Sequence, residues 1–558
     1  MMRLVVWRAL YLSLLLCAAW PTQAQDIALR PVSSTTALTR VFIVSAPGAT
    51  PVFGTILIKN GLIEAAGPSV VIPGQARIVD GDSMYVYAGF ISGLSQVAVP
   101  KPERQESPER VADPGNASRE RAGITPQSLV SEKLDPKDKD LSEYRAAGFT
   151  MAHVVPMGQM MPGQGALVLL HGDSPEAMLI KDQVSLFAQW QGALGVYPSN
   201  LLGVMATWKD LYHKTEMNIR HEKSYAANPA GKARPQTSPE EKALFPVVNR
   251  TLPVMFEAND LMSVHRAINL SEELGFSLMI GEVGESWSLA KTFSDKKIPV
   301  FLTMDLPELE KDLANPDTIT DARRKEAAQL RQRKNEIAMN HINQAKMMAE
   351  AGTAFGFSTM EVKPKDVMEN LGVMMSHGLS ADQALTALTT APAQLLGLSA
   401  VAGTVSPGKM ANLVVMDAPF GAEKNSVRMT IVEGEVFQFE AKKKKKADAA
   451  NSAPVLIAGK WRYMVESPQG SNGGILTIKG EDGSYEGTIE SDRMGTAVDL
   501  NDVTLAGNNL TFSYSVDGGG RSFTVNVDVE VEGDSFEGTV SVGEFGTFDI
   551  EGDREPGN

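Results

Sequence analysis

The chain holds few side chains of the kind that bind transition metals. It has seven histidines and a single cysteine, Cys17, among 558 residues. No two histidines stand in a His-x-His or His-x-x-x-His arrangement, which would place two imidazoles on one side of a strand or helix. We therefore expect surface or core histidines, and no zinc ion held by three nitrogen ligands. The seven histidines are His153, His171, His213, His221, His265, His341 and His377.

Carboxylates offer a different chemistry at the ends of apolar segments. Glu257 follows the strand-like residues 252–256, and Glu282 closes another such run. If both face inward, the pair could hold Mg²⁺ or Ca²⁺ together with water. Alternatively, an arginine or lysine neutralises one carboxylate, or the two share a proton. Glu361 is the carboxylate nearest to a third apolar segment, residues 351–359, and could join the acidic set.

The elements that must position these side chains alternate along the chain. Between residues 89 and 399, apolar strand-like runs and amphipathic helices follow one another, as is typical of βα units around a parallel sheet. Residues 260–274 predict a helix, and Ser380 with a glutamine three residues later predicts the N-terminus of another. The Gly-Gln-Gly sequence at 163–165 predicts a backbone turn, and the polar stretch 222–242 predicts a long surface loop.

Two sequence motifs resemble the amidohydrolase superfamily, and in particular its imidazolonepropionase-like members. Residues 88–96 resemble the first barrel strand, Pro-Gly-(Phe/Leu)-Ile-Asp-x-His-x-His, and residues 403–417, GTVSPGKMANLVVMD, resemble the C-terminal signature. The resemblance implies an α/β fold with a TIM-like (β/α)8 barrel over residues 89–399. It also implies a small β-sandwich built from both flanks of the barrel, residues 36–88 and 400–438.

The positions that carry metal ligands in the superfamily hold other residues here. Leu94 and Gln96 stand where the first strand has two histidines. Glu257 stands at the strand-five histidine, Glu282 lies at or within one residue of the strand-six histidine, and Ser358 or Thr359 replaces the strand-eight aspartate, which is both ligand and general base. Leucine offers no lone pair to a metal. These six residues are the candidate pocket positions, and no catalytic residue is assigned: Leu94, Gln96, Glu257, Glu282, Ser358 and Thr359.

Two functions follow from this comparison. By resemblance the chain is a hydrolase of carbon–nitrogen bonds other than peptide bonds. The substituted positions favour a pseudoenzyme with a degenerate metal site and no cofactor, which binds a small-molecule ligand or pairs with a related active amidohydrolase. The alternative is an active metal-dependent amidohydrolase whose divalent metal is held by Glu257, Glu282 and Glu361.

The two ends of the chain predict export and a separate domain. Residues 1–24 have the basic, apolar and small-residue regions of a bacterial signal peptide, which implies a periplasmic or secreted protein; lipidation of Cys17 is the alternative. The apolar run is too short to span a membrane. Residues 440–454 form a Lys/Ala-rich linker, and residues 455–554 alternate like a lipocalin-like antiparallel β-barrel or sandwich. The net charge of −15 argues against a nucleic acid partner.

Overall fold

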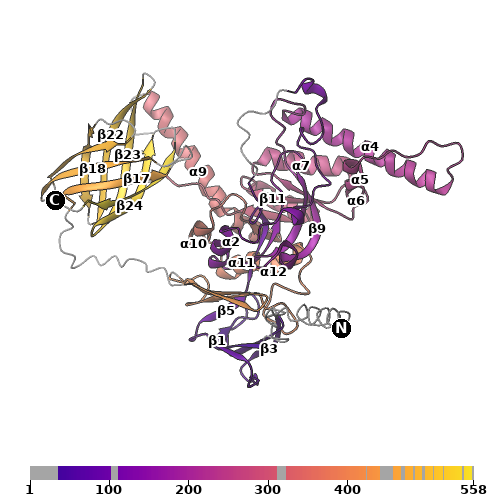
Figure 1. The fold of residues 1–558 in the computed structure, drawn as a ribbon, viewed down its shortest axis with the longest axis horizontal. Coiled ribbons are helices and arrows are strands. Elements are labelled where there is room, and N and C mark those ends of the chain that lie inside the picture. Colours follow the sequence, from indigo (N-terminus) through magenta and orange to yellow (C-terminus); the bar gives the residue numbers. More distant parts are fainter. Residues whose placement is uncertain are drawn as a thin grey trace, which may run out of the picture. The chain divides into compact units, whose positions relative to one another are not determined.

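The computed structural model describes residues 35–101, 111–310, 322–422, 424–439 and 457–555, the last range without 467–471, 482–483, 493–496, 507, 519–520 and 543–545. The chain divides into two compact units, Met1–Lys442 and Lys443–Asn558 (Figure 1). The predicted signal peptide and the predicted linker lie outside the described residues. Within the described residues, no helix combines the length and apolarity needed to cross a membrane.

The two flanks of the first unit meet in one sheet. Strand β5 pairs antiparallel with β14, so that Ala88 lies opposite Leu413. The strand order is β16-β15-β14-β5-β1-β2-β3, with β4 on β1. Asn60 and Gly61 both have positive φ, as a tight β2–β3 hairpin requires. This sheet confirms the composite β-structure. Its strands are β1 (Thr35–Ile43), β2 (Val52–Lys59), β3 (Leu62–Gly67), β4 (Arg77–Asp80), β5 (Tyr85–Ala88), β14 (Leu413–Met416), β15 (Val427–Val432) and β16 (Glu435–Gln438).

The second sheet of this unit is a barrel of eight strands in the order β13-β12-β11-β10-β9-β8-β7-β6. It closes between its first and last strands, where the Thr359 amide donates to the Leu94 carbonyl at 2.9 Å. The TIM-like barrel is thereby confirmed. Its strands are β6 (Phe90–Ser95), β7 (Phe149–Val154), β8 (Gly163–Leu169), β9 (Leu179–Ala188), β10 (Val254–Glu257), β11 (Leu278–Val283), β12 (Val300–Thr303) and β13 (Phe355–Ser358).

Strand β8 departs from the parallel order predicted for the barrel. It runs antiparallel to both β7 and β9. The predicted turn at 163–165 is wrong, because these residues begin β8. Gly165 lies on the inner face, where a Cβ atom would come within 2.7 Å of His153 Nε2. Glycine is therefore a packing requirement at this position rather than a turn signal.

Helices surround the barrel (Figure 1). The predicted helix 260–274 is present as α7 with Asp260 as its cap, and Ser380 and Gln383 form the predicted capping box of α11. The α-helices are α2 (Asp140–Ala146), α3 (Pro175–Met178), α4 (Leu201–Ala227), α5 (Pro239–Ala243), α6 (Phe245–Val248), α7 (Leu261–Leu274), α8 (Ala290–Lys296), α9 (Ala322–Glu350), α10 (Val367–Ser376), α11 (Ala381–Leu388) and α12 (Thr390–Leu395). Short 3₁₀ turns are η1 (Pro114–Asn116), η2 (Val130–Lys133), η3 (Trp287–Leu289) and η5 (Pro364–Asp366).

The second unit is one antiparallel sheet in the order β20-β19-β18-β17-β25-β24-β23-β22-β21. β19 contacts β21 and β20 contacts β22, so the sheet curls nearly closed, as the predicted antiparallel barrel requires. Apolar side chains such as Trp461, Phe512 and Phe536 fill its interior. Its strands are β17 (Gly459–Glu466), β18 (Asn472–Glu481), β19 (Ser484–Ser491), β20 (Ala497–Asp499), β21 (Asn501–Ala506), β22 (Asn509–Gly518), β23 (Arg521–Glu532), β24 (Ser535–Val542) and β25 (Thr547–Arg554).

Candidate functional site

Leu94 fills the centre of the barrel. Its side chain is fully buried and belongs to an apolar cluster that includes Met255 and Phe301 from β10 and β12. The packing is close, because a Cβ atom at Gly281 would lie 2.4 Å from Leu94 Cδ2. Interiors packed at this density leave no room for an additional ion or water. Leu94, which was predicted to line the pocket, is therefore part of the hydrophobic core.

The two hydroxyl residues after β13 are already engaged. Thr359 Oγ1 lies 2.9 Å from Ser92 Oγ, and both residues are buried. The single hydroxyl proton of Ser358 is shared between the Leu94 carbonyl, 3.1 Å from Oγ, and the Glu282 carboxylate. Neither residue has a carboxylate, so neither can act as the general base that the sequence comparison leads one to seek at these positions.

Glu282 is a buried carboxylate in a strained backbone position. Its φ is +58°, in the left-handed region that non-glycine residues seldom occupy, and the register of β11 against β12 shifts between Ile280 and Val283. Such a bulge redirects a side chain, and strain of this kind concentrates at functional sites. Ser358 Oγ donates to Glu282 Oε2, whereas Oε1 is buried and has no hydrogen-bond partner.

Burial raises the pKa of Glu282 to about 7, although the hydroxyls of Ser358 and Thr303 oppose the shift. The charges of Glu361 and Glu257 raise it further. Glu282 is only 1% exposed, which explains why burial is the main cause of the shift. With a pKa of about 7, its carboxyl is partly protonated near neutral pH.

Glu257, at the end of β10, is half-buried and lies at the mouth of the barrel. Burial, and secondarily the charge of Glu361, raise its pKa to about 7. Among the described residues, neither Glu257 nor Glu282 has an arginine or lysine as its partner. The predicted neutralisation by a basic residue is therefore not found in this part of the chain.

A cavity of about 1150 Å³ opens at the carboxyl ends of the barrel strands. This is the end of a TIM barrel where active sites lie. Gln96 follows β6, Gln189 follows β9, Glu257 ends β10, and Glu361 follows β13, so the cavity gathers residues far apart in sequence. Leu94, Glu282, Ser358 and Thr359 lie outside its lining. The full lining is Gln96, Glu120, Gly123, Thr125, Gln127, Ser128, Glu132, Lys133, Met157, Gly158, Gln159, Pro162, Gln189, Gln191, Glu240, Glu257, Met360 and Glu361.

The residues present do not fit the metal centre of the superfamily. Within the ranges that the structure describes, no group of three or more His, Cys, Asp or Glu side chains is placed to hold a metal ion. Glu257, Glu282 and Glu361 therefore do not form such a group, although their charges influence one another. A firm site needs three or more donors converging on one point.

His153 is a core residue. It is fully buried on β7, where Nδ1 lies 3.1 Å from the Gly93 carbonyl and Nε2 lies 3.0 Å from Ser185 Oγ. Burial lowers its pKa to about 4, so the imidazole is neutral at physiological pH. Its two ring nitrogens are committed to strands β6 and β9, as expected for a core histidine.

Part of the cavity wall comes from segments that match no sequence motif. Glu120 and Glu132 lie in the segment between β6 and α2, and Glu240 lies in α5. Only local charge marked these residues in the sequence, and charge alone does not distinguish a cavity wall from a solvated surface. They were therefore missed as site residues.

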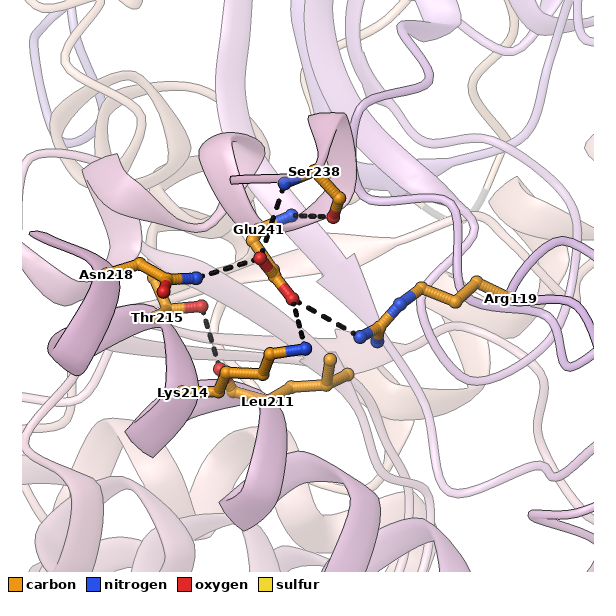
Figure 2. Close-up of polar contacts among 7 residues, drawn as sticks. All are labelled: Arg119, Leu211, Lys214, Thr215, Asn218, Ser238 and Glu241. Carbon is orange, nitrogen blue, oxygen red and sulfur yellow. Dashed lines mark hydrogen bonds and ion pairs between the residues drawn. The ribbon is translucent and has the colours of Figure 1, made fainter. Parts of the chain in front are cut away.

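A buried glutamate fastens this wall to helix α4 (Figure 2). Glu241 is 3% exposed. Its Oε1 lies 2.8 Å from Lys214 Nζ and 3.5 Å from Arg119 Nη2, and its Oε2 accepts from Asn218 Nδ2 at 2.8 Å. Burial opposes ionisation, but Lys214, the Ser238 amide and Arg119 together lower the pKa of Glu241. We call these five residues the Glu241 cluster.

The Glu241 cluster joins three parts of the chain. Arg119 precedes Glu120, and Glu241 follows Glu240, so the cluster fixes two carboxylates of the cavity wall. Lys214 belongs to α4, which the sequence alone did not connect with either segment. The cavity wall is therefore held by an ion-pair network with a buried centre.

Comparisons with known proteins agree with this architecture. Residues 300–437 match the model of the Amidohydrolase family. An amidohydrolase from Thermotoga maritima MSB8 is 21% identical, with a TM-score of 0.56 over 72% of this chain and 100% of its own. A putative prolidase from Bifidobacterium longum is 17% identical, with a TM-score of 0.43 over 73% of this chain and 95% of its own. Phenylurea hydrolase B is 15% identical, with a TM-score of 0.43 over 72% and 97%.

No curated protein matches the chain by sequence. The likeness to the Thermotoga maritima structure covers that whole chain, and at this identity it establishes the fold. The chain therefore has the amidohydrolase fold, and residues 300–437 carry the sequence match to that family.

Proposed function

We propose that this chain is an exported bacterial protein of the amidohydrolase superfamily that binds a small molecule at its barrel mouth and lacks metal-dependent hydrolysis. The observation that carries the proposal is the burial of Leu94 in the apolar centre of the barrel, at the position of the first-strand ligands. A hydrolase in this superfamily needs a metal to activate water, and a leucine side chain cannot help to hold one.

The positions around Leu94 support the same conclusion. Gln96 offers only a neutral amide at the cavity wall, and Thr359 is hydrogen-bonded to Ser92. Ser358 is bonded to Glu282, so the place of the general base holds a hydroxyl that is already used. A positioned acid or base contributes about 10²–10⁴-fold to catalysis, and no carboxylate takes that place here.

Pairing with a related, active amidohydrolase is a further part of this proposal. A chain that keeps the fold and the cavity but has lost the metal ligands could serve such an enzyme by binding its ligand or by stabilising it. Co-purification with a second amidohydrolase from the native organism would support this role, and isolation of the protein as a homogeneous assembly of its own would contradict it.

A carboxylate-based enzyme is the second candidate function. It is favoured by one observation: Glu257 and Glu282 both have pKa values raised to about 7, and catalytic acids and bases often titrate near the working pH. Metal-dependent turnover by this chain, lost on adding a chelator and abolished in Glu257→Ala, would establish this function and overturn the proposal above.

The test is the metal content of the purified mature protein. After supplementation with zinc and removal of excess metal, elemental analysis should give less than roughly a tenth of an equivalent, since two ligands are absent and the loss of one supporting residue already costs about 10–100-fold in affinity. The same preparation should not hydrolyse a panel of small amides, lactams and N-acyl amino acids. Stoichiometric zinc would contradict a degenerate site.

A further inference from the structure

The cavity at the barrel mouth is acidic. Its lining includes the carboxylates of Glu120, Glu132, Glu240, Glu257 and Glu361. Among the described residues that line it, Lys133 alone carries a basic side chain. A concave wall lined by one sign of charge concentrates the opposite charge inside it. Anionic ligands are therefore disfavoured here.

A buried carboxylate oxygen near the end of β11 lacks a hydrogen-bond partner. Glu282 is nine-tenths buried or more, and its Oε1 is without a hydrogen bond. The bulge in β11 turns its carboxylate toward Ser358, whose Oγ also accepts from the Met360 amide at 3.3 Å, and Met360 lines the cavity. Buried acceptors without partners are rare in folded proteins and call for a specific explanation. Through Ser358 and Met360, the Glu282 carboxylate is therefore connected to the lining of the cavity.

The remaining lining suits an organic body rather than a bare ion. Met157 and Met360 contribute apolar, adaptable surfaces, and Gln96, Gln159 and Gln189 contribute amides that can donate or accept hydrogen bonds. The volume of about 1150 Å³ is slightly larger than that of most small-molecule sites, so the cavity can hold an organic molecule. Because no three carboxylates are gathered as metal ligands in the described ranges, the negative charge is spread over the cavity instead of focused at one point.

We propose that this cavity binds an organic cation, a small molecule that carries a primary ammonium or guanidinium group, with Glu257 and Glu361 contacting the charged group. This inference rests on the proposed function, because it names the ligand class of the same site. Glu257 is half-buried at the inner end and Glu361 is exposed at the rim, so the two carboxylates define a path from solvent to the cavity floor. Glu120 and Glu240, which also line the cavity, are the chain neighbours of Arg119 and Glu241 in the Glu241 cluster.

The test is isothermal titration calorimetry on the full-length mature protein with agmatine, which carries a guanidinium and an ammonium group. The matched probe is 4-guanidinobutyrate, which keeps the guanidinium group and has a carboxylate in place of the terminal CH2–NH3+ group of agmatine. We expect agmatine to bind at one site and 4-guanidinobutyrate to bind at least about tenfold more weakly. The double variant E257Q/E361Q should weaken agmatine binding by about tenfold or more, because the cationic group of agmatine then has no carboxylate of Glu257 or Glu361 to pair with.

The control variant is Glu350→Gln, which removes one carboxylate at the end of α9, before β13 and so away from the barrel mouth. It should leave the affinity for agmatine within about twofold of that of the unmodified protein. Circular dichroism and thermal unfolding of each variant verify that the fold is kept. Equal affinities in E257Q/E361Q and Glu350→Gln would overturn the proposal, as would equal binding of the two probes or no binding of agmatine at millimolar concentration.

Titrations of Zn²⁺ and of Mg²⁺ alone into the same protein distinguish a failure of the organic-cation inference from a failure of the proposed function. If neither metal binds and agmatine also fails to bind, the organic-cation inference is overturned while the degenerate metal site stands. If either metal binds stoichiometrically, and E257Q/E361Q abolishes that binding, the acidic cavity is a metal site and both proposals are overturned.

Discussion

At the scale of single residues, Glu282 is an ionisable group held inside the barrel, with no arginine or lysine partner among the described residues. The hydroxyl of Ser358 donates a hydrogen bond to its carboxylate, and burial favours the protonated form. A protonated carboxyl needs no counter-ion. Glu282 therefore remains partly neutral over part of the physiological pH range.

Glu282 should make the stability of the first unit depend on pH. Its folded pKa, about 7, is above the ordinary value of 4.5, so between these two pH values the folded chain keeps a proton that the unfolded chain has lost. Stability therefore falls as pH rises from about 4.5 to 7, and the penalty is fully present above 7. Glu282→Gln should remove its part of this dependence and stabilise the protein at pH 8 by roughly 1–3 kcal/mol, with little change at pH 4.5.

Denaturant unfolding of both proteins at pH 4.5 and pH 8 measures this difference, with Glu350→Gln as the control for loss of one carboxylate. Glu257 titrates over the same range, so Glu257→Gln should remove a second, smaller part of the slope. An identical pH dependence in Glu282→Gln and in the unmodified protein would show that Glu282 is ionised in the same way in both states.

Restoring the first-strand histidines alone should not create a hydrolase. Leu94→His and Gln96→His supply two nitrogen donors, but Glu257 and the Ser358–Thr359 pair leave one ligand and the general base missing. Leu94→His also places a polar ring in a close-packed apolar centre, so a loss of stability of about 2–4 kcal/mol is expected. Zinc stoichiometry, turnover on small amides and unfolding free energy test this double variant.

A fuller set, which adds Glu257→His and Thr359→Asp (or Ser358→Asp), should bind metal and give trace turnover that a chelator abolishes. The comparison of the double and the fuller variants isolates the role of the missing ligand and base. Chelator-sensitive hydrolysis by the double variant would mean that another carboxylate already serves as the base.

At the scale of elements, the Glu241 cluster decides where the cavity wall stands. It joins the loop at Arg119 to α5 through a side chain of α4, and the partners are up to 122 positions apart in the sequence. Ion pairs with a buried partner are costly to break, because the remaining charges lose their compensation. This network gives a rigid wall to a segment that has little regular secondary structure of its own.

Glu241→Ala should destabilise the first unit by about 2–3 kcal/mol, less than a fully buried pair would, because Arg119 and Lys214 remain partly exposed. The matched control is Glu273→Ala in α7, which removes the exposed partner of Lys209, a residue of α4 like Lys214. The two charged groups are 2.8 Å apart, and the substitution should cost less than about 0.5 kcal/mol. Denaturant unfolding measures both. Equal effects of the two substitutions would mean that the cluster adds no more than an ordinary surface pair.

At the scale of the whole molecule, the chain combines an amidohydrolase-fold unit with an antiparallel β unit that has its own core. Trp461 is buried in that core, its ring contacts Phe536, and the Arg554 guanidinium lies 4.1 Å from the ring centroid. A unit with a separate hydrophobic core is expected to unfold as a separate cooperative step. The cavity and the proposed ligand belong entirely to the first unit.

Export is the prediction that belongs to the whole chain. We expect the mature protein to begin near Gln25 and to carry no cysteine, since cleavage after residue 24 removes Cys17. N-terminal sequencing of protein recovered from the periplasm or the medium measures this. A Cys17→Ser variant should be exported as efficiently as the unmodified protein. A retained Met1, or a lipid attached to Cys17, would contradict the prediction.

The sequence by itself determined the features that depend on local pattern. The motif at 403–417 and the strand at 88–96 predicted that both flanks share a sheet, and β5 and β14 pair there. The caps at Asp260 and Ser380 predicted two helix starts, because a capping side chain bonds to amides two or three residues away. Residue identity alone also predicted that Leu94 contributes nothing to a metal.

Only the tertiary structure decided the features that arise between distant segments. Strand β8 pairs antiparallel with both of its neighbours, and the first residues of the loop predicted at 222–242 belong to α4. The acidic cavity, the Glu241 cluster and the bulge at Glu282 each require partners that no local pattern connects. Burial and register, which set the charge and direction of those side chains, are properties of the packed chain and not of any one segment.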